Sequence, residues 1–146
     1  MMNKYLIIAV MLCLIASILY KRWAMSYALK ELYAIRKTGD GERFIQAVDS
    51  GFMKLQFNVF TREFIKLNYW IDRNDHEEVK ELLPVLERLK AKPAQEIALY
   101  YKLYEYALKN GWSGEVESYG WHLEGLLQHN RDRESMRIKK EIINAK

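Results

Sequence analysis

The chain has 146 residues, half of them hydrophobic, with only two prolines and seven glycines. This length allows one domain, or one short domain with an anchor, and the scarcity of proline and glycine argues against many short strands joined by tight turns. The net charge of +4 is unevenly placed, since residues 21–37 and 131–146 are basic and residues 39–130 are mildly acidic. No basic patch is interleaved with a nucleic-acid-binding motif, so we expect no nucleic-acid partner.

The first element is an uncharged run from Tyr5 to Tyr20, bounded by Lys4 and by Lys21-Arg22. A spanning helix needs about twenty residues, but flanking lysines reach the membrane interface and aromatic residues suit it. We therefore interpret residues 1–22 as a transmembrane anchor and residues 23–146 as a helical repeat domain. A cleaved signal peptide is the alternative, although Lys21-Arg22 stands where a neutral cleavage region is expected.

The basic residues after this run outnumber those before it, which favours a single-pass protein of the cell membrane with a cytoplasmic C-terminal domain. Cys13, the only cysteine, lies inside the run, so no intramolecular disulfide is possible. No glycine or proline occurs from Met1 to Thr38. We therefore expect the spanning helix to continue unbroken into the first helix of the domain, where Met25, Ala28, Leu29, Leu32 and Ile35 form an apolar stripe.

Three helix-turn-helix joins follow at nearly equal spacing, around Gly39-Asp40, Asn74-Asp75 and Gly111. In the first pair we expect a helix that starts after Asp40 and ends near Gly51, with Phe44, Ile45, Val48 and Phe52 inward. In the second pair we expect an N-cap at Asn58 and a capping box formed by Asp75 and Glu78, with Pro84 kinking the second helix.

The third pair begins after Lys92-Pro93 and is apolar over more than half its circumference, which is typical of a helix packed on both sides. We expect Ser113 to cap its second helix. The core side of that helix is expected to hold Val116, Tyr119, Gly120, Leu123, Leu126 and Leu127. The last segment, Asp132 to Asn144, is short and charged, as expected of a terminal capping helix.

Helix pairs with a period of about 36 residues resemble the tetratricopeptide-repeat (TPR) family. If Tyr69 takes the place of the consensus glycine, Pro93 falls at the closing proline, whereas Glu81 and Val85 replace the Ala-x-x-x-Phe pair. The resemblance implies an all-α fold: an N-terminal transmembrane helix, an α-solenoid of about three TPR-like repeats, and a C-terminal capping helix. A divergent repeat of a related helical-hairpin type is the alternative.

The same period aligns basic residues of successive first helices. Two basic positions per helix, seven residues apart, share one face. In the TPR-like alignment they fall where that family lines its concave groove and holds peptide carboxylates. The candidate groove, with two aromatic platforms, comprises Lys30, Lys37, Lys66, Trp70, Arg73, Lys102, Tyr106 and Lys109. The alternative is that these lysines occupy a solvated face.

We find no pattern typical of an enzyme, a cofactor site or a metal site. The three histidines lack partners at ligand spacing, and no phosphate-binding loop, serine elbow or Cys-His pairing occurs. The sequence thus predicts a membrane-anchored module that recruits or scaffolds a protein or peptide partner, possibly an acidic one. The alternative is a small structural membrane protein that self-associates through its repeat faces.

Overall fold

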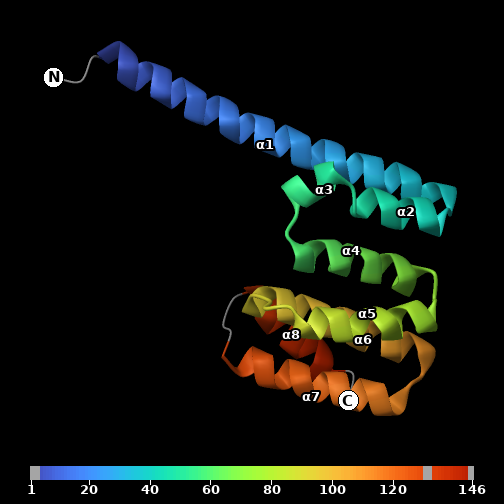
Figure 1. Cartoon of the computed structure of the whole chain (residues 1–146). Coiled ribbons are helices and arrows are strands. Elements are labelled where there is room, and N and C mark those ends of the chain that lie inside the picture. Colours follow the sequence, from blue (N-terminus) through green and yellow to red (C-terminus); the bar gives the residue numbers. More distant parts are fainter. Residues whose placement is uncertain (1–3, 130–132, 145–146) are drawn as a thin grey trace. The chain divides into compact units, whose positions relative to one another are not determined.

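The computed structural model describes residues 4–129 and 133–144. Every regular element in these ranges is an α-helix, which confirms the all-helical prediction (Figure 1). The helices, in chain order, are α1 (Lys4–Thr38), α2 (Gly41–Val48), α3 (Gly51–Gln56), α4 (Val59–Asp72), α5 (His76–Arg88), α6 (Pro93–Asn110), α7 (Ser113–Gln128) and α8 (Arg133–Asn144). The chain forms two compact units, Met1–Tyr69 and Trp70–Lys146.

In the first unit, α1 is one continuous helix of 35 residues that passes through residues 22 and 23 without a break, as expected. It ends where Gly39 adopts a φ of 81°, a conformation that glycine reaches without strain. The Thr38 hydroxyl donates a hydrogen bond to the carbonyl of Ile35 in this last turn. By length and composition, α1 is a candidate membrane-spanning helix, and its most apolar window is 0 % buried in the structure.

The second half of α1 packs against α2 and α3. Its buried residues are Ala24, Ala28 and Leu32, spaced four apart on one helical face. Small alanines let the neighbouring helices come close, and these helices bury Phe44, Val48 and Met53. Figure 1 shows α3 beside α1 and nearer than α2 to the apolar end of α1.

The expectation that the second helix ends near Gly51 was wrong in detail. α2 ends at Val48, and Gly51 is the first residue of a separate short helix, α3. The break arises because the Ser50 hydroxyl accepts a hydrogen bond from the backbone N–H of Met53 and starts a new helix as an N-cap.

α4 begins after Asn58, whose side chain accepts a hydrogen bond from the N–H of Thr61, so the predicted N-cap is confirmed. Its inner face in the first unit holds Phe60, Leu67 and Tyr69. The Tyr69 ring stacks on Phe44 with ring centres 4.2 Å apart, which fixes α4 against α2.

In the second unit, Asp75 caps α5 by accepting a hydrogen bond from the N–H of Glu78, and Pro84 lies inside α5 as expected. α6 begins at Pro93, where the missing N–H costs nothing because the first turn of a helix has no partner for it. The buried residues of α6 lie on more than one face, as predicted: Ile97, Leu99, Tyr100, Leu103, Tyr104, Tyr106 and Ala107.

α6 and α7 form an antiparallel hairpin joined through Gly111, which has a φ of 70°. The prediction that Ser113 caps α7 was wrong: Trp112 holds the N-cap position, and Ser113 is the first helical residue. The Trp112 ring packs against His76 and Tyr106, so tertiary packing decides where α7 begins.

α8 lies against this hairpin and buries Ile138 and Ile142, leaving Met136 and Ile143 exposed. The hydroxyl of Tyr101 on α6 donates a hydrogen bond to the Glu141 carboxylate on α8. The predicted short, charged terminal helix is therefore present from Arg133, while Asp132 lies outside the described residues.

Candidate functional site

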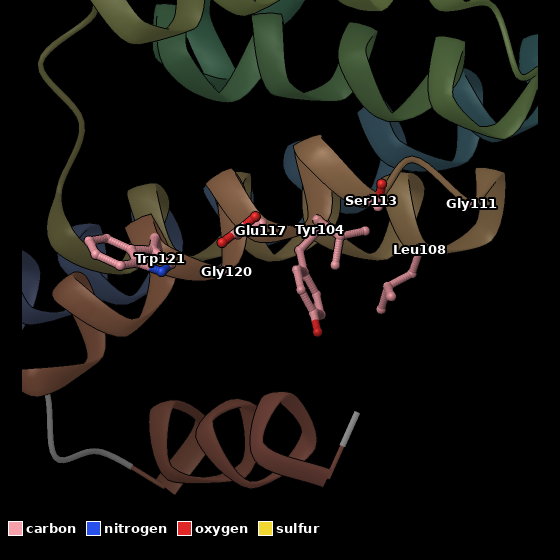
Figure 2. A pocket seen from close by; sticks show the side chains of 8 residues that line it. Tyr104, Leu108, Gly111, Ser113, Glu117, Gly120 and Trp121 are labelled. Atoms are coloured by element: carbon pink, nitrogen blue, oxygen red, sulfur yellow. The ribbon is translucent and has the colours of Figure 1, made fainter. Parts of the chain in front are cut away.

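A groove of about 480 Å³ opens along the α6–α7 hairpin near its turn. Figure 2 shows Tyr104 and Leu108 of α6 pointing into it, with Trp121 farther along α7. The lining residues are Tyr104, Leu108, Gly111, Ser113, Val116, Glu117, Gly120 and Trp121. We call this hollow the α6–α7 groove.

The described part of α8 is shorter than α6 and covers only part of the hairpin. At 1.5 Å per residue, α6 is about 27 Å long and α8 about 18 Å. Glu141, three residues before the end of α8, bonds to Tyr101 in the middle of α6. The described part of α8 therefore ends near the level of Tyr104 and does not reach Leu108 at the turn end of the hairpin.

Gly120 sets the depth of the groove. This residue is buried, and a Cβ atom at its position would lie 3.5 Å from the Tyr104 ring. A glycine here lets the aromatic ring of α6 lie directly against the α7 backbone. A methyl group here would make an ordinary van der Waals contact with the Tyr104 ring, whereas a longer side chain would project toward the ring and change the groove floor.

Trp121 is the most exposed large aromatic residue of the second unit, with 74 % of its surface accessible. It borders the α6–α7 groove and also a neighbouring hollow of about 440 Å³ lined by Ser118, His122, Gly125 and Leu126. An indole exposed to water between two hollows contributes little to the folding stability of a monomer. Exposed aromatic residues of this kind are enriched at protein interfaces.

The α7 side of the groove is acidic. α7 contains Glu115, Glu117 and Glu124 and neither lysine nor arginine. Glu115 and Glu117 are exposed, and Glu117 lines the groove itself. The electrostatic potential at this surface therefore favours a cationic group on a bound molecule.

We call the basic residues of the candidate groove predicted from the sequence the basic ladder. They divide between the two units. In the first unit, Lys30 is exposed and the Lys37 ammonium lies 4.6 Å from the centre of the Tyr33 ring. Lys66 is 8 % exposed, and its ammonium lies 2.8 Å from the Asp49 carboxylate and 3.0 Å from the Glu63 carboxylate. Lys66 therefore joins α4 to the junction between α2 and α3.

We predict that Lys66→Met lowers the free energy of unfolding by about 1–3 kcal/mol, because Glu63 and Asp49 lose a charged partner at a largely buried site. Urea unfolding of the full-length chain in mild detergent, followed by circular dichroism, measures the change. Lys80→Met is the control, since its 3.8 Å pair with Glu77 is exposed and should contribute little. Equal effects of the two substitutions would contradict a structural role for Lys66.

In the second unit, Lys102, Tyr106 and Lys109 lie together around a small cleft of about 120 Å³, which Asp72 and Glu105 also line. Carboxylates thus already share the site with both lysines. Tyr106 is buried and bonds to the His76 ring, so it is not an exposed platform. Burial raises the pKa of Tyr106, and the charge of Asp75 adds to this. Of the remaining two predicted residues, Trp70 is half-buried and Arg73 is exposed.

Two histidines of the second unit, His76 and His122, pack against aromatic rings. His76 bonds to the Tyr106 hydroxyl and packs on Trp112, whereas His122 stacks on Tyr100 with ring centres 3.8 Å apart. Within residues 4–129 and 133–144, no group of three or more His, Cys, Asp or Glu side chains is placed to hold a metal ion.

The sequence reasoning missed Trp121 and Leu108 as site residues. The sequence did contain evidence for Trp121 as a site residue, because this residue is large and apolar yet lies off the Leu123–Leu127 stripe that packs inward.

A search of protein-family models, curated proteins and solved structures found no match to this chain.

Proposed function

We propose that this protein is a membrane-anchored, TPR-like interaction module that binds a segment of a partner protein in the α6–α7 groove. The observation that carries the proposal is Trp121, an indole 74 % exposed at the edge of a hollow floored by Tyr104. Tryptophan and tyrosine are the residues most often found to dominate binding energy at protein interfaces.

The repeat assignment is supported by the spacing of the helix joins. The second helices of the three pairs, α2, α5 and α7, begin at Gly41, His76 and Ser113. These starts are separated by 35 and 37 residues, close to one repeat of a helical-hairpin solenoid. In such a solenoid each hairpin face is covered by the next helix. A partner helix can occupy the part of the α6–α7 face that α8 leaves open.

The expected partner segment combines apolar and basic side chains. Leu108, Val116 and Trp121 offer an apolar wall, and Glu117 offers a carboxylate at the same hollow. An amphipathic helix with a lysine or arginine beside its apolar stripe matches both features. A basic partner helix differs from the acidic partner expected from the basic ladder. In that ladder, Lys66 is already paired with two carboxylates.

Membrane anchoring by α1 is the second half of the proposal. A core helix would bury its apolar side chains, whereas the apolar part of α1 is exposed. A signal peptide would end in a neutral cleavage region, whereas Lys21-Arg22 stands at that place and α1 runs through both residues without a break. These features favour a retained single-pass anchor, with a cytoplasmic domain by the positive-inside rule.

A site-specific crosslink in native membranes tests the binding site. With the photoreactive amino acid benzoylphenylalanine at Leu108, we expect one covalent adduct with a partner whose crosslinked segment is apolar and basic. The same probe at Lys109, the next residue of α6 and part of the small cleft, is the matched control and should give no adduct.

The other outcomes are equally informative. An adduct from Lys109 but not from Leu108 would place binding at the basic ladder and contradict the groove. An adduct of twice the mass of the chain would show self-association through this face, which is the rival function.

A further inference from the structure

We propose that α3, together with the aromatic residues that follow the apolar run of α1, forms a foot that rests in the headgroup layer of an anionic membrane. The foot comprises Tyr20, Trp23, Tyr27, Phe52, Lys54 and Leu55. This inference rests on the proposed anchoring by α1, but it assigns a membrane-contacting surface to a different element, α3.

The aromatic residues of the foot form a continuous row. Tyr20, Trp23 and Tyr27 follow one another along α1 with successive ring centres 6.2 Å and 5.7 Å apart. Phe52 of α3 meets Tyr27 edge-on with ring centres 6.2 Å apart. Each of the three α1 rings is more than half exposed. Tyrosine and tryptophan are enriched at membrane interfaces because their rings are apolar and their tips are polar.

α3 presents two kinds of side chain that suit a lipid surface. Met53 is buried against the first unit, while Leu55 is 82 % exposed, the highest exposure of any large hydrophobic residue in the described chain. Lys54, beside it, is also exposed. An exposed leucine next to a lysine is costly in water but stabilised where acyl chains meet charged headgroups.

The length of the apolar run places α3 at the right depth. Tyr5 to Tyr20 forms about 24 Å of helix, which is about 6 Å short of a typical hydrocarbon core. A short span draws its flanking residues toward the bilayer. Tyr27 lies about 10 Å along the helix from Tyr20. Tyr27 and its neighbour Phe52 therefore fall at or close to the headgroup layer, which is about 5–8 Å thick on each side.

The charge around the foot selects anionic lipids. Residues 21–37 contain five basic residues and one acidic residue. All six of these charged residues are exposed, and Lys54 adds a further exposed cation from α3. Basic clusters directly after a spanning helix attract the negative lipids of the cytoplasmic leaflet.

The test compares two labelled positions of the full-length chain in nanodiscs. In a Cys13→Ser background, the fluorophore NBD is attached to Leu55→Cys or to the control Gln46→Cys, an exposed position on α2. With 30 % phosphatidylserine in phosphatidylcholine, we expect acrylamide to quench the label at position 55 at least threefold less than the label at position 46. Equal quenching at the two positions would overturn the foot.

A charge reversal tests the lipid specificity. Lys54→Glu should increase quenching at position 55 in phosphatidylserine nanodiscs and leave it unchanged in pure phosphatidylcholine. The same quenching with and without Lys54→Glu would overturn the anionic part of the inference. Carbonate extraction of the unlabelled chain from native membranes separates this inference from the anchor. Retention with equal quenching refutes the foot alone, whereas release refutes both.

Discussion

Replacing Trp121 with alanine is expected to weaken partner binding about thirtyfold, corresponding to about 2 kcal/mol, the usual loss at a tryptophan that dominates an interface. The indole is 74 % exposed and borders two hollows, so it can become buried between the chain and its partner. Fluorescence anisotropy measures the loss, using the labelled peptide mapped from the crosslink at Leu108.

The substitution should leave the fold intact. An exposed side chain contributes little to stability, and alanine is the better helix former. The thermal unfolding midpoint of Trp121→Ala should therefore equal or slightly exceed that of the native chain. This separates a binding role from a structural one.

Val85→Ala provides the matched control, because Val85 is an exposed apolar residue on α5 that does not line the groove. It should change the affinity less than twofold. An equal loss of affinity in the two variants would show that general surface hydrophobicity, rather than the α6–α7 groove, drives binding.

Alkaline pH is expected to destabilise the second unit between about pH 10 and 12, with Tyr100 contributing about 1–2 kcal/mol of this loss after solvent screening. Burial raises the pKa of Tyr100 from 10.0 to about 12, and the hydrogen bond that its hydroxyl donates to Glu87 adds to this. The unfolded chain loses this proton near pH 10 while the folded chain keeps it. Stability is therefore complete below pH 10 and is lost as the pH rises to about 12.

Three further tyrosines of the same unit act in the same direction. Burial raises the pKa of Tyr101, Tyr106 and Tyr119, with additional contributions from the hydrogen bond to Glu141 and from the charges of Asp75 and Glu115 respectively. Their common effect should make the alkaline transition steep.

Urea titrations at pH 9, 10, 11 and 12 measure the predicted loss. Tyr100→Phe should be less stable than the native chain at pH 9, because it lacks the bond to Glu87, yet lose less stability between pH 10 and 12. Parallel pH profiles for the two proteins would contradict the role assigned to the Tyr100 proton. All other ionisable groups are the same in the two proteins, so the comparison isolates the Tyr100 proton.

The positions of the helix joins could be predicted because their signals are local. Gly39 and Gly111 adopt positive φ values, and Asp40 and Asp75 cap the helices that follow. Such signals depend only on backbone conformation and on hydrogen bonds over three residues. The unbroken α1 was predictable for the same reason, since nothing in its sequence stops a helix.

The environment of Lys66 could not be predicted, because its main partner, Asp49, lies seventeen residues earlier in the chain. Lysine is seldom buried, so its periodic position suggested a solvated or ligand-binding face. Only the packing of α4 on the α2–α3 junction brings the two charges together. Sequence spacing therefore showed which helical face Lys66 occupies, but not what that face meets.

The start of α7 and the groove depend on tertiary packing in the same way. Trp112 holds the N-cap position because its ring packs on His76 and Tyr106, which overrides the preference for serine there. The groove depends on how far α8 reaches along α6, which the Tyr101–Glu141 hydrogen bond fixes. Neither the first residue of α7 nor the reach of α8 along α6 can be read from the spacing of apolar residues.

With α1 as the proposed anchor, its continuity also sets a rotational phase between the membrane and the first unit. Ala24, Ala28 and Leu32 fix which side of α1 faces α2 and α3. Since no residue of this helix can act as a hinge, the same packing fixes which side of the apolar run faces each direction in the bilayer. One inserted residue near Arg22 would turn the first unit by about 100° about the helix axis, and seven would nearly restore it. Under the proposed anchoring, the direction in which the first unit faces within the membrane plane is therefore set by α1 itself.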